Sequence, residues 1–384
     1  MAVGSWTLIE QVLLGVMAAV WLYQLYFYFR YILAAVRRTR TAQAKEETDE
    51  ASLPGVSVIV CAKNEEANLR DYLQALMTQD YPVFEVIVVN DGSVDNTELY
   101  LEFWQKRYSN LKLTFVPQGA KVGSTKKLAI TLGAKAAQYD CLLLTDADCR
   151  PESTHWIREM VSGFRSPEKQ IVLGAGMYFR KRGLLNRLIQ FDTLFTALQY
   201  LGLAACGHPY MGVGRNLAYR KQLFFEHGGF VGLMNNRAGD DDLFVNREAT
   251  ATNTAVVATP ESLTWSVPKL RWRDWFRQKR RHLSVSTKYK PSTRLRLLLE
   301  PLTRGVLYAM LIALCVLGSW QTQLIALAAL VIRWMVQCFM LNTAANRWGT
   351  TKIILLIPVW EILLPLVTLV LMLIEPLRPK PKRW

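Results

Sequence analysis

Four long apolar runs divide this 384-residue chain into membrane-like ends and a soluble middle. The runs cover roughly residues 8–29, 301–317, 324–341 and 353–374. Each is close to the ~20 residues that an α-helix needs to cross a bilayer. Residues 52–296 have the composition of an ordinary soluble protein. The pattern therefore predicts one soluble domain held between membrane segments.

Charges around the first apolar run favour an anchor that is retained. No Lys or Arg precedes the run, whereas five basic residues follow it within residues 30–45. A cleaved signal peptide has the opposite arrangement, with its basic region in front. Because basic residues gather on the cytoplasmic side of spans, we expect an integral protein of the cytoplasmic (inner) membrane with its soluble domain in the cytoplasm.

Within the soluble middle, short β-rich runs alternate with stretches of helical spacing. Strands are expected at 56–61, 84–89, 112–116 and 141–145, with helices between them at 68–77, 96–107 and 126–138. Such alternation gives right-handed βαβ units and a mainly parallel sheet. The predicted fold class is α/β, with a mixed extension beyond Pro151.

The formal charge of +15 and the six cysteines exclude several classes of function. Much of the basic excess lies beside the membrane segments, where anionic lipid headgroups explain it better than nucleic acid does. The domain also lacks the aromatic and basic signatures of RNA binding. No C-x-x-C pair is present, so a zinc site is not expected, and a cytoplasmic domain should have no disulfides.

Two aspartates stand at the end of the most apolar strand. Asp146 and Asp148 follow three consecutive leucines, and residues i and i+2 of an extended chain point to the same side. Both carboxylates can therefore bind one cation, and their hard oxygens suit Mg²⁺ or Mn²⁺ shared with substrate phosphates. A loop start without metal is the alternative for this pair taken alone.

Two more acidic groups follow a strand or a glycine-rich loop. Asp91 comes after the second strand, and Asp240-Asp241-Asp242 follows residues 232–239. Adjacent carboxylates repel one another unless a metal or a helix N-terminus compensates. Asp241 could act as a general base toward an acceptor hydroxyl. Taken alone, these groups also fit a turn and the first turn of a helix.

Order and spacing connect these groups to a known family. Residues 56–66 resemble its first strand and Asn-Glu loop, and Asn90-Asp91-Gly92-Ser93 resembles its Asp-Asp-Gly-Ser element, with Asn90 in place of the first Asp. Asp146-Ala147-Asp148 resembles its D-x-D motif. Gly239-Asp240-Asp241 resembles its Gly-Glu-Asp motif, with Asp240 in the Glu position. The chain thus resembles a membrane-bound family 2 glycosyltransferase.

This resemblance implies a GT-A fold and a nucleoside diphosphate sugar donor, UDP-linked. Asp91 would contact the uracil or ribose, with Glu65 near the nucleotide. Asp146 and Asp148 would hold Mg²⁺ or Mn²⁺ on the diphosphate, and Asp241 would be the base, with Asp240 beside it as a second catalytic residue.

Two lysines follow the sequence Gly123-Ser124-Thr125. Lys126 and Lys127 could help bind the donor phosphate or the acceptor, and Lys127 is included among the expected donor ligands. A solvated helix start is the alternative for both lysines.

Residues 278–282 match a fifth motif only in part. They resemble the Q-x-x-R-W motif of processive polysaccharide synthases and ceramide glucosyltransferases, with His282 where Trp is expected. Gln278 and Arg281 share one helix face, and Arg281 could contact the diphosphate. A basic helix on lipid headgroups is the alternative. Gly214 lies in a segment that resembles the acceptor side of the family's site.

Three membrane-related features leave alternatives open. Residues 183–203 could lie on the membrane surface or form a buried helix. Arg333 could contact a lipid phosphate or a polymer, or pair with Glu361. The last apolar run contains two prolines, so we expect it to re-enter rather than cross, which keeps the basic tail 378–383 inside.

The sequence as a whole predicts an inverting, metal-dependent glycosyltransferase. Its acceptor would be lipid-linked or a polysaccharide, at the cytoplasmic membrane face, and its other partners would be membrane lipids and no nucleic acid. A processive synthase that exports its polymer is the alternative, and a silent scaffold or a transporter is a weaker one. No G-x-G-x-x-G follows the first strand, which argues against an NAD-dependent enzyme.

We expect the following organisation: a transmembrane anchor in 1–30, a basic linker in 31–51, the GT-A catalytic domain in 52–270, an amphipathic interfacial segment in 271–296, membrane segments in 297–376 and a basic tail in 377–384.

Overall fold

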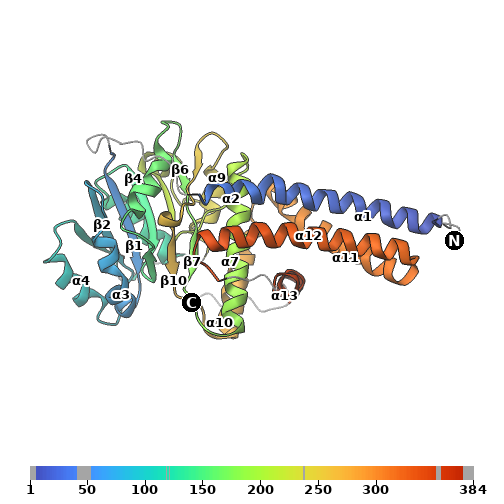
Figure 1. Ribbon diagram of the computed structural model, residues 1–384. Coiled ribbons are helices and arrows are strands. Elements are labelled where there is room, and N and C mark those ends of the chain that lie inside the picture. Colours follow the sequence, from blue (N-terminus) through green and yellow to red (C-terminus); the bar gives the residue numbers. More distant parts are fainter. Residues whose placement is uncertain are drawn as a thin grey trace.

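The computed structural model describes residues 6–40, 53–117, 119–120, 122–236, 238–351 and 356–374. Figure 1 shows a domain built on β-sheets at one end and a bundle of long helices projecting from it. This is the division into a soluble domain and membrane segments that the apolar runs predict.

A seven-stranded sheet with the order β3-β2-β1-β4-β8-β6-β9 forms the core of the domain. Its strands are β1 (Val56–Ala62), β2 (Phe84–Asn90), β3 (Leu111–Phe115), β4 (Cys141–Asp146), β6 (Ile171–Leu173), β8 (Leu217–Arg220) and β9 (Thr254–Val256). The first four strands are parallel, and β8 is antiparallel to both β4 and β6. The side chains of β1 and β4 are almost all buried, as expected for strands covered on both faces.

Helices α3, α4 and α5 connect the parallel strands. They span Glu66–Met77, Thr97–Gln105 and Thr125–Ala136, close to the expected ranges. The connections place the loops after β1, β2 and β4 at one edge of the sheet, where open α/β sheets bind their ligands.

Short elements complete the domain beyond β4. A second sheet joins β5 (Cys149–Pro151), β10 (Thr264–Ser266) and β7 (Gly176–Tyr178). The remaining short helices are α6 (Trp156–Val161), η3 (Ser162–Phe164), α8 (Lys221–Glu226), α9 (Asp242–Glu248) and η4 (Pro260–Ser262). This is the mixed extension expected beyond Pro151.

Helix α7 (Leu184–Ala205) lies between the sheets and the long helices (Figure 1). Fourteen of its 22 residues are buried, including the polar Asn186 and Gln190. Of the two alternatives for this segment, the structure therefore shows the buried helix. Helix α10 (Trp272–Ser286) packs beside it and corresponds to the predicted amphipathic segment.

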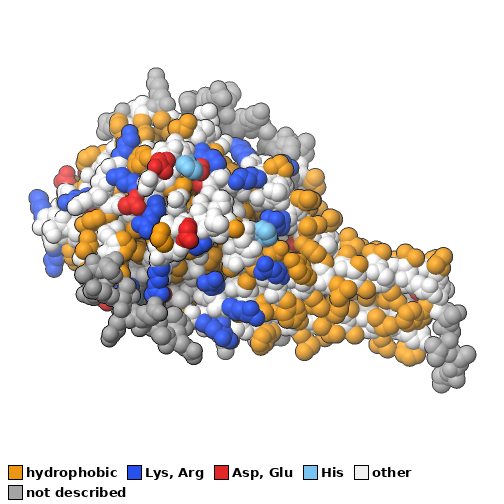
Figure 2. Space-filling view, turned by 90° about the horizontal axis from the view of Figure 1, so that it is seen from above, with side chains coloured by type: hydrophobic (Ala, Val, Ile, Leu, Met, Phe, Trp, Pro, Cys, Tyr) orange, Lys and Arg blue, Asp and Glu red, His pale blue; other side chains and the backbone are white. Residues whose placement is uncertain are grey.

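Among the described residues, three helical segments are long and apolar enough to cross a membrane: Leu8–Arg38, Pro291–Leu317 and Trp320–Arg347. The first comprises α1 (Leu8–Phe27), a π-helical turn η1 (Tyr28–Ile32) and α2 (Leu33–Arg38); the others are α11 and α12. Figure 2 shows hydrophobic side chains covering the projecting bundle, with Lys and Arg gathered where it meets the domain. The chain is therefore a membrane protein.

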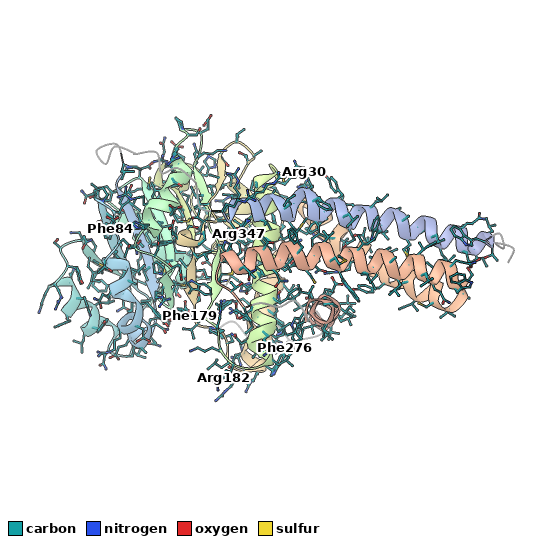
Figure 3. All side chains as sticks on the ribbon, in the orientation of Figure 1. Arg30, Phe84, Phe179, Arg182, Phe276 and Arg347 are labelled. Atoms are coloured by element: carbon teal, nitrogen blue, oxygen red, sulfur yellow. The ribbon has the colours of Figure 1, made fainter. Side chains whose placement is uncertain are left out.

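The first span is packed tightly against α7. A Cβ added to Gly202 would lie only 2.1 Å from the carbonyl oxygen of Tyr31, so the two backbones are in direct contact. Near the same junction, Arg347 donates from Nη1 to the carbonyl oxygen of Val36 at 2.8 Å. Figure 3 shows Arg30 and Arg347 at this junction of bundle and domain.

Helix α13 (Ile357–Ile374) has a different direction from the spans. Figure 1 shows it end-on, whereas α1, α11 and α12 run across the view. The re-entry of this segment into the membrane remains our prediction. The fully buried pair Arg333 and Glu361 joins α12 to α13 at 2.9 Å, so Arg333 has the carboxylate partner that was one of its two expected roles. The basic tail lies outside the described residues.

Candidate active site

Two loops at the carboxyl edge of the sheet are joined by side-chain hydrogen bonds. Asn64 adopts a left-handed conformation, with φ of 56°, and its Oδ1 accepts from the amide of Val94 at 2.8 Å. The Ser93 hydroxyl accepts from the Asn64 amide at 2.9 Å. Asn90, which replaces an Asp of the motif, accepts from the Ser93 amide at 3.0 Å. The amide side chain therefore keeps the loop geometry without adding a negative charge.

Asp91 lies in this pair of loops, and its side chain is nearly buried. The Thr125 hydroxyl donates to Oδ2 of Asp91 at 2.5 Å, and the Lys63 ammonium lies 3.6 Å from the same oxygen. Asp91 thus connects the loop after β2 to the start of α5. Its position at the sheet edge is compatible with the predicted nucleoside contact.

Glu65 lies at the start of α3, within electrostatic reach of the aspartate pair. Asn68 donates to its Oε2 at 2.5 Å. Burial raises the pKa of Glu65, and the charges of Asp148 and Asp146 raise it further. The structure therefore brings Glu65 near two carboxylates that are far from it in sequence.

Asp146, Asp148 and Cys149 offer ligand atoms that all lie within 4.8 Å of one another. The Cys149 thiol contacts Oδ1 of Asp148 at 3.4 Å and the Ser266 hydroxyl at 3.0 Å. Burial and the charge of Asp146 raise the pKa of Asp148. A divalent cation would relieve this repulsion, and two carboxylates are ligands that Mg²⁺ or Mn²⁺ accepts. The residues present thus fit the expected metal.

Lys126 connects this pair to the third acidic group. Its Nζ lies 2.9 Å from Oδ1 of Asp146 and 3.1 Å from Oδ2 of Asp240. Although burial opposes its charged form, the two carboxylates hold the pKa of Lys126 well above its usual range. The D-x-D pair and the Asp240–Asp242 cluster therefore face one common space.

Lys127 has a different role from the one expected. Its side chain is fully buried, and its Nζ donates to the carbonyl oxygens of Asn236 at 2.6 Å and Ala238 at 2.8 Å. The structure does not bring this ammonium to the donor loops, because it is bound to the loop before Asp240. The alternative of a solvated helix start is wrong for this residue, whereas its neighbour Lys126 lies in the site.

Asp241 forms the N-cap of α9. Its Oδ1 accepts from the amide of Asp242 at 2.8 Å, and its Oδ2 accepts from the amide of Gly214 at 2.7 Å. Burial and the charge of Asp240 raise the pKa of Asp241, and the Gly214 amide lowers it. The cluster therefore does start a helix, which was the alternative expected for it. The same N-cap contact holds Asp241, the expected base, in place.

The two neighbouring aspartates have different surroundings. Burial opposes the charged form of Asp240, but Lys126 keeps the pKa of this residue below its usual value. Asp242 accepts from the Tyr289 hydroxyl at 2.8 Å, away from Lys126. Burial and the charge of Asp241 raise the pKa of Asp242 to about 8. The three carboxylates can thus share one place without three full negative charges.

A cavity of about 100 Å³ lies between α7 and α10, next to this cluster. Its wall includes Met211, Val213 and Arg215, which flank the glycine whose amide binds Asp241. The cavity extends along α7, whose other contacts include the first span and α12. Helix α7 thus borders both the cavity and the membrane helices.

Helix α10 contributes one face to the cavity. Trp275, Gln278, Lys279 and His282 line it, which is the i, i+3, i+4, i+7 spacing of a single helix face. Gln278 donates to the Tyr178 hydroxyl at 2.9 Å. Arg281 is exposed and is not part of this lining, so the structure brings Gln278 together with His282 rather than with Arg281. Figure 3 marks Phe276 on the same helix, close to α7.

Sequence reasoning did not single out Tyr178, Asp192 or Arg215, which line this cavity. The guanidinium of Arg215 lies over the Tyr178 ring, 4.3 Å from its centroid. Asp192 of α7 accepts from Nζ of Lys279 at 2.6 Å. The sequence did offer a signal for Asp192: it is an acidic residue in the apolar stretch 183–203, and a buried carboxylate in such a helix needs a partner.

Curated relatives match parts of the chain. A probable glycosyltransferase, YdaM of Bacillus subtilis, is 27% identical over 236 residues, which are 60% of this chain and 54% of that protein. A poly-β-1,6-N-acetyl-D-glucosamine synthase of Staphylococcus epidermidis is 31% identical over 103 residues, which are 27% of this chain and 24% of that one. The chain thus spans about half or less of the length of these relatives.

A solved structure supports the fold over nearly the whole chain. The mannosyltransferase PcManGT of Pyrobaculum calidifontis, in complex with GDP-Man and Mn²⁺, aligns with a TM-score of 0.56 and 21% identity. The alignment covers 89% of this chain and 99% of that one. The GT-A fold with attached membrane helices is therefore confirmed. The model of glycosyl transferase family 21 matches residues 17–374, so the chain belongs to this family and is a glycosyltransferase.

Proposed function

We propose that this protein transfers a sugar, with inversion, from a nucleoside diphosphate sugar to a membrane-associated acceptor at the cytoplasmic face. The observation that carries the proposal is the position of Lys126, which contacts Asp146 on the metal side and Asp240 on the acceptor side. One ammonium group thus joins the expected metal ligand to the acidic cluster expected to hold the base.

The donor side is assigned to the loops after β1, β2 and β4. Asp91 and Glu65 would contact the nucleoside part, and a UDP-linked donor remains our expectation. Asp146 and Asp148 would hold Mg²⁺ or Mn²⁺, which when bound offsets negative charge on the departing nucleoside diphosphate. PcManGT binds GDP-Man together with Mn²⁺, and its fold similarity is compatible with a metal here.

The acceptor side is assigned to Asp241 and the adjoining cavity. Asp241 would accept the proton of the acceptor hydroxyl as that oxygen attacks the sugar. Its raised pKa suits this task, because a base with a pKa closer to the working pH transfers protons more effectively. Gly214 orients the carboxylate through its amide, and Gln278 and His282 line the cavity in which the acceptor would lie.

A lipid-linked acceptor is favoured by the place of the cavity beside α7. It lies along α7, the helix that separates the catalytic domain from the spans. A hydroxyl group near Asp241 could therefore belong to a molecule whose apolar part stays in the bilayer. The catalytic domain would face the cytoplasm, since Arg37 and Arg38 at the end of the first span are on the domain side.

The test is a screen of nucleotide sugars for hydrolysis and transfer by the full-length protein with Mn²⁺ or Mg²⁺. Asp241→Asn should retain donor binding and lose transfer by about 10²- to 10⁴-fold, the usual contribution of a general base. Asp148→Asn should weaken metal binding itself, measured with Mn²⁺ alone. Near-normal turnover of the Asp241 variant would show that the base is assigned wrongly, and Asp240→Asn would then be compared.

A further inference from the structure

We propose that Arg215 binds the diphosphate of the donor and supplies the guanidinium group that the partial Q-x-x-R-W match assigned to Arg281. The inference rests on the proposed function, because it takes a nucleoside diphosphate sugar as the donor. It adds to the site one binding residue, from the loop before β8, to which the family resemblance gives no role.

The backbone of Arg215 is attached to the strand that carries the first aspartate of the pair. Its carbonyl oxygen accepts from the Thr145 hydroxyl at 3.1 Å, and Thr145 directly precedes Asp146 in β4. On its other side, the amide of the preceding residue, Gly214, binds Asp241. The backbone of Arg215 thus adjoins both acidic groups of the site.

The guanidinium group of Arg215 is held against the second sheet. It lies over the Tyr178 ring, 4.3 Å from the centroid, and its Nη2 donates to the carbonyl oxygen of Gly176 at 2.7 Å. Gln278 donates to the Tyr178 hydroxyl at 2.9 Å and so holds the ring. A Cβ on Gly176 would lie 2.3 Å from Nε, so the missing side chain makes room for the guanidinium. The orientation of Arg215 is therefore fixed by the protein alone.

This positive charge has no carboxylate partner in the described part of the chain. Lys63, Lys126 and Lys279 each form an ion pair with an aspartate, whereas Arg215 forms none. Its Nε is buried without a hydrogen-bond partner, and its Nη1 makes no hydrogen bond to the described residues. Arg215 also lines the cavity. Because a buried charge without a partner is costly, we infer that an anion completes the site.

The charge of Arg215 acts on the aspartate pair. Burial and the charge of Asp146 raise the pKa of Asp148, and the charge of Arg215 is one of the influences that lower it again. Charges that interact in this way belong to one electrostatic environment. A phosphate held beside Asp148 would therefore be attracted by Arg215 as well.

A guanidinium group suits a diphosphate better than an ammonium group does. Its planar fork offers parallel N–H donors to two phosphate oxygens at once. The side chain of Arg281 is exposed and does not line the cavity. Of these two arginines, Arg215 is the one that acts on Asp148.

The assigned contact would also act during transfer. The acceptor oxygen forms the new bond to the anomeric carbon of the sugar, and its proton passes to Asp241. The bond between that carbon and the diphosphate oxygen breaks, and its electron pair stays on the oxygen. Arg215 would offset the negative charge that appears there.

The probe for the experiment is inorganic pyrophosphate, which carries the diphosphate without a nucleoside or a sugar. Its affinity for the full-length protein is measured by calorimetry in the presence of Mg²⁺. Arg215→Met should weaken binding about 10- to 100-fold, as expected for the loss of charged hydrogen bonds. Arg215→Lys keeps the charge but loses the fork, so its affinity should lie between those of the wild type and Arg215→Met.

A second variant moves the guanidinium without removing it. The Cβ of Gly176→Ala would displace the Arg215 side chain, so pyrophosphate should bind more weakly although the charge remains. Melting temperatures report whether each variant is folded. If Arg215→Met does not fold, Arg215→Lys and Gly176→Ala still decide the question.

The matched control is a second arginine that lies over an aromatic ring. Arg220, the last residue of β8, lies over the Phe164 ring at 4.6 Å from the centroid and pairs with Asp140. Arg220→Met should change the pyrophosphate affinity by less than about twofold, because this pair is at the surface. An unchanged affinity in folded Arg215→Met, or equal losses in Arg215→Met and Arg220→Met, would overturn the inference.

A lipid head group is the other source of a phosphate. If Arg215→Met weakens binding of lysophosphatidic acid but leaves pyrophosphate binding unchanged, the site serves a lipid phosphate and the inference is wrong. Hydrolysis of nucleotide sugars by the wild type is measured in parallel. Its absence would contradict the proposed function, whereas hydrolysis together with an unchanged pyrophosphate affinity in Arg215→Met would contradict only this inference.

Discussion

The backbone amide of Gly214 lies 2.7 Å from Oδ2 of Asp241. The contact uses only main-chain atoms of Gly214, and a Cβ at this position would meet the Asp241 carboxylate at an ordinary 3.4 Å. Gly214→Ala should therefore keep activity within about threefold, whereas Gly214→Pro removes the donor and should cost about 10- to 100-fold, as for a hydrogen bond to a charged group. The measurement is the rate of sugar transfer, with folding checked by thermal melting.

The same contact makes a prediction about pH. The Gly214 amide lowers the pKa of Asp241, so its loss should raise that pKa. A base acts in its deprotonated form, and the acidic limb of the rate profile should therefore move to higher pH in Gly214→Pro. An unshifted limb alongside a reduced rate would argue that Asp241 is not the titrating base.

Replacing Lys126 by Met should lower activity, whereas replacing Lys127 by Met should lower stability. Lys126 contacts the two acidic groups, so its loss should reduce activity and donor affinity with little change in melting temperature. Lys127 holds the loop at Asn236 and Ala238, so its loss should destabilise the domain by about 2–4 kcal/mol. Activity assays and thermal melts on both variants check this, and equal behaviour of the two would contradict the assignment.

Asp242 should make the protein less stable as pH rises. Its pKa in the folded state is about 8, above the value of an unfolded Asp, so the folded state binds the extra proton. Stability from this group is present below about pH 4 and is lost as pH rises to about 8. Asp242→Asn cannot lose this proton, so its melting temperature should depend less on pH between 5 and 8. A steeper dependence in the variant would contradict the prediction.

The buried pair Arg333 and Glu361 should be sensitive to removal of one partner. Arg333 donates from Nη1 to both oxygens of Glu361, at 3.0 and 2.9 Å, and from Nε to Gln24 at 3.0 Å. Glu361→Gln should destabilise the detergent-solubilised protein by about 3–5 kcal/mol, because it leaves the buried guanidinium without its counter-charge. Replacing both residues by Met should cost much less, since no charge is then left unpaired.

The fold was predictable because its signals are local. Apolar runs and helical spacing placed β1, β2, β4 and α5 within about two residues of their observed bounds. The four parallel strands then required their loops to meet at one edge. The order of the motifs indicated where the site lies, and in the structure Asp146 and Asp240 contact the same ammonium group, that of Lys126.

What sequence did not resolve depends on contacts between distant segments. Lys126 and Lys127 are adjacent, and only the direction of α5 decides which one faces the carboxylates. The charge of Asp192 is explained by its ion pair with Lys279, 87 residues away. The direction of α13 follows from its packing on α7, α10 and Arg333, which no hydropathy window can detect.

The contact between Gly202 and the Tyr31 carbonyl has a consequence for how the enzyme meets its membrane. Because two backbones touch there, the first span cannot slide or rotate against α7 without separating the domain from its anchor. The height of the catalytic centre above the bilayer is thereby set by the protein itself. Under the proposed function, an acceptor that remains in the leaflet would be glycosylated only if its reactive hydroxyl lies at the height of the catalytic centre.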